Sequence, residues 1–199
     1  RDNVRYVWKN GSDEDLNPEG KVPSSNDNGV DLGLSVQWAT CNVGAKTVDQ
    51  VGNYYSWATT QPYDANTSAN YDSSVNPCSQ DGVLTYKYDA VSYNWGKQWR
   101  MPTKKEFQEL KENCTWRWLD ELNGVNVSGY LVTSKKNGNS IFLPAAGTQE
   151  SFVYNEGNVG YYWTSSFDGD TAAYVLYFYF HSEEVTSGKT VRFIGIPIR

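Results

Sequence analysis

Apolar and polar residues alternate along several short stretches of this chain, and each stretch predicts a strand. Residues 30–44, VDLGLSVQWATCNVG, alternate in this way and predict a half-buried strand. Its apolar positions are Leu32, Leu34, Val36 and Trp38. Residues 174–181 predict another strand, and a turn near Ser187 and Gly188 leads from there to a last strand at 190–199.

The segment 129–147, GYLVTSKKNGNSIFLPAAG, predicts a β-hairpin. Two strand-like runs meet at Asn137 and Gly138, and this pair accepts the positive φ angles of a type I′ turn. The two runs are therefore expected to pair with each other.

Residues 99–114, WRMPTKKEFQELKENC, carry the strongest helix signal in the chain. Thr103 is a favoured N-cap residue, and Glu106 three positions later completes a capping box. Phe107, Leu110 and Cys114 then fall on one face of the helix. Several short strands with one strong helix indicate an α+β domain dominated by antiparallel sheet.

Two polar stretches interrupt this pattern. Residues 1–28 are polar apart from VRYVW at 4–8, and we expect a linker or an extra edge strand before a compact domain at 29–199. Residues 58–82 have almost no apolar content and predict a long surface loop.

The charge balance argues against one class of partner. The chain carries 17 Lys and Arg residues against 23 Asp and Glu residues, a net charge of -6, and no basic run, so we do not expect it to bind nucleic acid. No apolar run approaches the roughly 20 residues that a bilayer span requires, so no transmembrane segment is expected in this chain.

The three cysteines, Cys41, Cys78 and Cys114, are an odd number without a C-x-x-C pair. This spacing disfavours a zinc cluster and allows at most one disulfide. A bridge between Cys41 and Cys114 and two buried free thiols are the alternatives that the sequence leaves open.

Few residues of the chain are candidates for catalysis. His181 is the only histidine, and no nucleophile elbow or phosphate-binding loop accompanies it. Acidic pairs act in glycosidases, but neighbouring carboxylates in one loop need not converge on a bond. The candidate pairs are Asp168 with Asp170 and Glu183 with Glu184. We expect a non-enzymatic protein without a cofactor, although the two aspartates leave an irregular calcium site open.

Tyrosine is unusually frequent, with 15 Tyr residues beside 7 Phe and 8 Trp. A buried ring gains nothing from a hydroxyl group unless that group finds a partner, so some of these rings are expected to face water. In GYYWTSSF, strand alternation puts Tyr161 and Trp163 on one side and Tyr162 on the other. Trp163 is the expected core residue, and one of the two tyrosines is a candidate platform for a ligand.

The following strand repeats this division. Tyr177, Tyr179 and His181 fall together on the face without Leu176 and Phe178. Flat rings with hydroxyl tips suit sugar faces, peptides and protein partners, because they offer contact area at low entropy cost. A second core beneath the 58–82 loop is the equally weighted alternative for these rings.

Six stretches of the chain carry a family resemblance. They are VDLGLSVQWATCNVGA (30–45), GNYYSWATT (52–60), NWGKQWRMPTKKEFQEL (94–110), CTWRW (114–118), GYLVTSKKNGNSIFLPAAG (129–147) and GYYWTSS (160–166). In this order and spacing, residues 30–199 resemble the Fibrobacter succinogenes major paralogous domain, a family abundant in envelope and secreted proteins of Bacteroidetes.

The resemblance implies a C-type-lectin-like fold with antiparallel sheets, one or two helices and long loops. In that fold Trp99 to Thr103 would open a helix, and a C-terminal sheet would present ligand-contacting side chains. The resemblance also implies adhesion or ligand recognition at a bacterial cell surface, attached to the outer membrane, or by a secreted protein.

This chain lacks two sets of functional residues that other proteins with this fold use. Formylglycine-generating enzymes use cysteines in the C-terminal part of the domain, and no cysteine follows Cys114 here. Calcium-dependent lectins use Gln-Pro-Asp or Glu-Pro-Asn motifs, and QPYD at 61–64 breaks that pattern. Neither formylglycine generation nor calcium-mediated sugar binding is therefore expected.

We thus expect a recognition domain that binds a glycan or a protein outside the cell through its C-terminal aromatic face. The residues predicted to contact the ligand are Tyr154, Asn155, Tyr161, Asp168, Asp170, Tyr174, Tyr177, Tyr179 and His181. The alternatives are a carbohydrate-active enzyme with an acidic pair and a structural module of a surface appendage, which would carry a large apolar patch.

Overall fold

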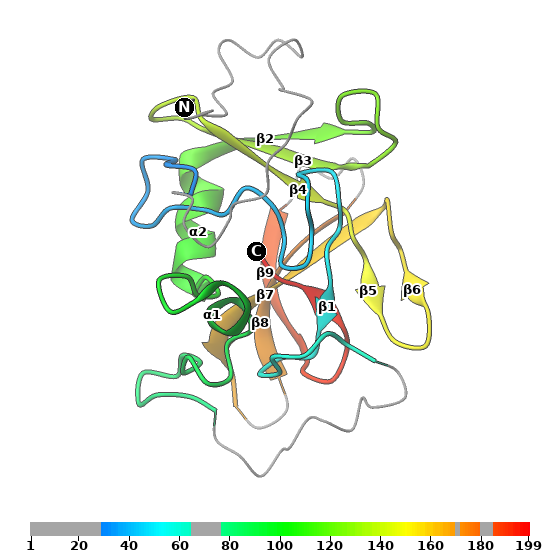
Figure 1. Cartoon of the computed structure of the whole chain (residues 1–199). Helices are drawn as coiled ribbons and strands as arrows, with labels where there is room; N and C mark the ends of the chain where they lie inside the picture. Colours follow the sequence, from blue (N-terminus) through cyan, green and yellow to red (C-terminus); the bar gives the residue numbers. More distant parts are fainter. Residues whose placement is uncertain (1–28, 65–76, 170–171, 180–184) are drawn as a thin grey trace.

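The computed structural model describes residues 29–64, 77–169, 172–179 and 185–199 (Figure 1). This part of the chain is mostly β-sheet with two short helices, which agrees with the predicted α+β class. No helix within it has the length and apolar character needed to cross a membrane. The predicted linker at 1–28 and the middle of the predicted loop at 58–82 lie outside the described residues.

The central sheet joins β7 (Val159–Phe167), β8 (Ala172–Tyr179) and β9 (Val185–Val191) as antiparallel neighbours. Both of its faces are covered. Tyr162 and Phe178 are buried in one core, whereas Trp163 and Val175 are buried in a second core on the opposite face. Trp163 is confirmed as a core residue, and Tyr162 is buried equally well because each face has its own core.

The first core lies between the central sheet, helix α2 (Lys104–Asn113) and a second antiparallel sheet. That sheet contains β2 (Cys114–Leu119), β3 (Gly129–Ser134) and β4 (Ser140–Pro144), which run across the top of Figure 1. Phe107 and Leu110 of α2 are fully buried in it, as the helical pattern predicts.

The second core is covered by helix α1 (Ala90–Trp95) and by the pair of β1 (Tyr54–Tyr55) with β10 (Ile196–Pro197). Its largest side chains are Trp57 and Trp163. A short hairpin of β5 (Thr148–Gln149) and β6 (Val153–Tyr154) lies beside this unit.

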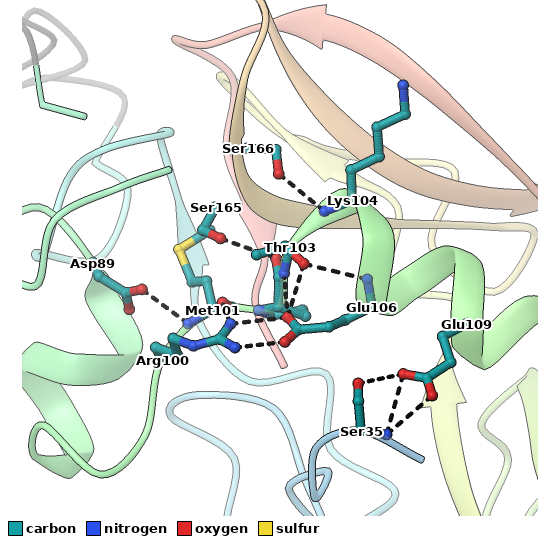
Figure 2. A network of polar contacts seen from close by, with 11 residues as sticks. Ser35, Asp89, Arg100, Met101, Thr103, Lys104, Glu106, Glu109, Ser165 and Ser166 are labelled. Carbon is teal, nitrogen blue, oxygen red and sulfur yellow. Dashed lines mark hydrogen bonds and ion pairs between the residues drawn. The ribbon is translucent and has the colours of Figure 1, made fainter. Parts of the chain in front are cut away.

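Helix α2 begins at the predicted N-cap. The Thr103 hydroxyl accepts a hydrogen bond from the Glu106 backbone N–H at 3.2 Å, and the Thr103 N–H donates to the Glu106 carboxylate at 2.7 Å. Arg100 donates to the same carboxylate from its two terminal guanidinium nitrogens, at 2.8 and 2.5 Å (Figure 2). The capping box is therefore confirmed, and Arg100 reinforces it.

The hydroxyl groups that follow the aromatic run of β7 attach this helix to the central sheet. The Ser165 hydroxyl and N–H both donate to the carbonyl of Pro102, at 3.3 and 2.8 Å, and the Ser166 hydroxyl accepts from the Lys104 N–H at 3.0 Å. Figure 2 shows both serines above the first turn of α2. These two hydroxyl side chains are occupied by structural contacts.

The predicted strand at 30–44 is wrong. Val30 and Trp38 exchange two backbone hydrogen bonds, of 2.7 and 3.0 Å, and the chain between them bends back on itself. Gly33 makes this reversal possible because its φ of 67° is a left-handed conformation that other residues avoid. The apolar residues Leu32 and Trp38 still reach the core.

The predicted turns need correction as well. The hairpin of β3 and β4 is confirmed, but only Gly138 has a positive φ, so its connection is a longer loop and not a type I′ turn. Ser187 and Gly188 lie inside β9, where a Cβ on Gly188 would come within 2.7 Å of the Tyr177 ring. The predicted last strand at 190–199 is divided between the end of β9 and β10.

Cys41, Cys78 and Cys114 are free thiols, and Cys41 and Cys114 are buried. The structure therefore agrees with the free-thiol alternative. Burial raises the pKa of all three, so each thiol stays protonated and unreactive near neutral pH.

Candidate functional site

Three of the predicted tyrosines form one surface at the end of the central sheet, which we call the tyrosine face: Tyr161, Tyr177 and Tyr179. Tyr161 and Tyr177 are cross-strand partners whose rings stack with centroids 5.8 Å apart and an angle of 26°. Tyr179 meets Tyr177 edge to face at 5.7 Å and 84°. Tyr179 is 46% exposed, and the other two rings are half-buried.

The strands hold these rings in fixed positions. Tyr161 and Tyr177 pack against the second core, and the glycine at position 188 leaves room for the Tyr177 ring. Burial, a hydrogen bond with Tyr179 and the neighbouring phenols raise the pKa of Tyr161 to about 12. Its hydroxyl group therefore stays protonated and neutral at physiological pH.

Tyr154 and Asn155 lie close to the same end of the sheet. The Asn155 carbonyl accepts a hydrogen bond from Val159 at 3.0 Å, and Val159 is the cross-strand partner of Tyr179. Asn155 itself has a φ of 60°, a left-handed conformation that asparagine tolerates better than most residues. Tyr154 is 46% exposed, and Phe152, two residues before it, is 73% exposed.

Asp168 and Tyr174 lie elsewhere. Tyr174 donates a hydrogen bond to Asp168 at 2.6 Å, and Lys189 forms an ion pair with the same carboxylate. The ammonium of Lys104 lies 3.8 Å from the centroid of the Tyr174 ring. Tyr174 is five residues from Tyr179 along β8, roughly 16 Å, and strand alternation places it on the opposite face.

The structure thus divides the predicted site into two groups. Tyr154, Asn155, Tyr161, Tyr177 and Tyr179 gather at one end of the central sheet. Asp168 and Tyr174 are engaged with lysines at the other end. Asp170 and His181 lie outside the described residues.

The acidic-pair alternative gains no support from the described residues. Glu183 and Glu184 lie outside them, as does Asp170. The hydrogen bonds from Lys189 and Tyr174 lower the pKa of Asp168, whereas a general acid needs a raised one. Asp89 does have a pKa raised by burial, but its carboxylate accepts the backbone N–H groups of Val91, Ser92 and Met101 at 2.9 to 3.0 Å and caps α1.

A hollow of about 380 Å³ shares no lining residue with the tyrosine face. It is lined by Ser56, Ala58, Thr59, Thr60, Gln61, Pro62, Tyr63, Asp64, Lys87 and Tyr88. The sequence singled out 58–82 as a long polar loop but none of these residues as a ligand contact. The signal that could have found them is the unusual length of that loop, since long loops in compact domains are often functional.

Within the described part of the chain, no group of three His, Cys, Asp or Glu side chains is placed to hold a metal ion. Comparison of the chain with family models, curated proteins and solved structures finds no match. The candidate site is therefore defined by its geometry.

Proposed function

We propose that this chain is a non-enzymatic recognition or adhesion domain of a bacterial cell-surface or secreted protein. It binds a glycan or a protein through the tyrosine face. The proposal rests on the contacts of Tyr161, Tyr177 and Tyr179 with one another on paired strands of the central sheet, where Tyr179 is 46% exposed.

The physical chemistry of the tyrosine face suits recognition. Its rings are fixed by strand pairing and by each other, so a ligand that stacks on them immobilises few side-chain rotations. Tyrosine contributes a flat apolar surface and one hydroxyl group for a directed contact, which is why it is enriched in binding surfaces.

The proposed fold is C-type-lectin-like, as the resemblance to the major paralogous domain implies. Two features support it: the WRMPT stretch opens helix α2, and the central sheet near the C-terminus presents the tyrosine face. The surface or secreted location is proposed on the same resemblance.

A glycan array, probed with and without calcium, tests this function first. We expect binding that calcium does not change, because QPYD at 61–64 departs from the motif of calcium-dependent lectins. The Tyr177→Ala and Tyr179→Ala variants should each weaken binding to the strongest array ligand by about 30-fold. This corresponds to the binding free energy of about 2 kcal/mol that is lost when an anchor residue is truncated.

The matched control for these variants is Tyr86→Ala. Tyr86 is 62% exposed and lies before α1, near the opposite end of β7 from Tyr179. Unchanged affinity in both tyrosine-face variants, or an equal loss in the control, would remove the assignment of the site.

One observation favours the alternative of an assembly module. Phe152, Val153 and Tyr154 expose apolar surface at the β5–β6 hairpin. Under that alternative the chain should self-associate in sedimentation velocity experiments, and Phe152→Ser should abolish the association. A monomer at all concentrations would leave the recognition role as the sole proposal.

A further inference from the structure

The hollow between residues 56–64 and 87–88 has firmly anchored walls. Tyr63 lies against Gly195, where a Cβ would come within 2.9 Å of its ring, and its N–H donates to the Tyr54 carbonyl at 2.7 Å. Tyr88 packs against the second core. The shape of the hollow is therefore set by the same core that supports the central sheet.

The lining of the hollow contains a strained residue. Ala58 has a φ of 66°, a left-handed conformation that costs a residue with a side chain about 1–2 kcal/mol. The turn is kept in place by the Thr59 N–H and hydroxyl, which both donate to the Ser56 carbonyl, at 3.2 and 2.8 Å. Such strain persists where the surroundings fix the backbone, as they do around many ligand sites.

Polar groups of the hollow remain free to bind. Among the described residues, the Thr60 hydroxyl and the Gln61 amide make no hydrogen bond, and the Lys87 ammonium lies 5.1 Å from the centroid of the Tyr88 ring. The hollow thus combines a hydroxyl, an amide and an ammonium with two aromatic rings.

We propose that this hollow is a second binding site, which takes a single neutral sugar ring. Its volume of about 380 Å³ lies near the lower end of the roughly 300–1,000 Å³ typical of small-molecule pockets, so it suits a small ligand. Free donors and acceptors beside an aromatic ring match a ligand that carries hydroxyl groups around an apolar face. Asp64 and Lys87 give the lining one charge of each sign, so it has no net charge that would select an anion or a cation.

Nuclear magnetic resonance titration of the full chain tests the second site. The probes are the methyl glycosides of glucose, galactose, mannose and N-acetylglucosamine, with N-acetylalanine methylamide as a peptide probe. At least one glycoside should shift the backbone amide signals of residues 56–64 and 87–88 in a saturable way. Thr60→Val and Gln61→Ala, which alter surface groups without touching the core, should each weaken that binding about fivefold or more, the usual weight of a hydrogen bond.

Tyr179→Ala is the control, because it removes a ring from the tyrosine face and none from the hollow. It should leave the sugar titration unchanged. The titration therefore tests the second site separately from the proposed function of the tyrosine face. The second site is overturned if no glycoside shifts these signals, if the peptide probe alone does so, or if the shifts persist with equal affinity in both hollow variants.

Discussion

Tyr162 shows how a tyrosine can serve the core of this molecule without a free hydroxyl group. Its hydroxyl donates to the Pro144 carbonyl at 2.9 Å and accepts from the Asn42 amide at 3.2 Å. Tyr179 differs because its ring lies at the end of β8 and remains open to solvent. Residue composition alone does not separate these roles, because the partners of Tyr162 are more than 15 residues away along the chain.

Replacement of Tyr162 by Phe tests the buried role. The change should lower the free energy of unfolding by about 1–2 kcal/mol, because two buried polar partners lose a hydrogen bond. Urea unfolding at neutral pH measures it, and Tyr93→Phe, at an exposed position, should have no effect. An equal stability of the two variants would contradict the assigned hydrogen bonds.

The same residue predicts a dependence on alkaline pH. Burial raises the pKa of Tyr162 above its ordinary value near 10, so the folded state favours the neutral phenol. Its contribution to stability is complete below about pH 10 and is lost as the pH rises further. Unfolding measured between about pH 9 and pH 11 should therefore show a steeper fall in stability for the natural protein than for Tyr162→Phe.

At the scale of elements, local signals suffice where a few neighbouring residues decide the structure. Helix α2 begins at Thr103 because the capping box is complete within four residues. Helix α1 was missed because it has six residues and the carboxylate of its cap, Asp89, also binds the distant Met101 N–H. The prediction of a strand at 30–44 was wrong because Gly33 reverses the chain direction, although apolar and polar residues do alternate there.

Thr103→Ala should lower the free energy of unfolding by about 1 kcal/mol, since the Glu106 N–H loses its acceptor. Lys105→Ala, an exposed change in the same turn, should lie within about 0.5 kcal/mol of the natural protein. Thermal unfolding of both variants measures the difference. A Thr103 variant as stable as the Lys105 variant would be inconsistent with the capping box.

At the scale of the whole molecule, Arg199 joins segments that are distant in the sequence. The Arg199 guanidinium is buried and donates to the carbonyls of Ala39, Thr40 and Phe142 at 2.8 to 2.9 Å. Burial lowers the pKa of Arg199, and these three acceptors are neutral carbonyl groups. Through these bonds the planar guanidinium of Arg199, which follows β10, connects β4 with the segment before β1.

Arg199→Ala should cost about 3 kcal/mol, because three buried carbonyls lose a charged donor. Arg199→Lys should restore only part of this, since one ammonium cannot reproduce the fork. Denaturant unfolding compares the two variants with Lys46→Ala, an exposed loss of charge. Full stability of the Lys variant would show that the positive charge alone is sufficient.

The sequence predicted the tyrosines and Asn155 that gather at one end of the central sheet, but not their separation from the other predicted residues. Strand alternation grouped Tyr177 with Tyr179 correctly, and the register of β7 with β8 adds Tyr161 to them. The separation of Asp168 and Tyr174 from this group depends on which end of the strand each occupies and on lysines from α2 and β9. The hollow forms where residues 56–64 lie close to residues 87–88, and no local sequence pattern predicts that contact.

Hydroxyl-radical footprinting of the protein, alone and with its strongest array ligand, tests the central claim most directly. Ligand contact with the tyrosine face predicts that oxidation of Tyr161, Tyr177 and Tyr179 falls on binding, whereas oxidation of the exposed Tyr86 and Tyr93 is unchanged. Protection of Tyr86 or Tyr93, with the three rings of the tyrosine face as reactive as before, would contradict it.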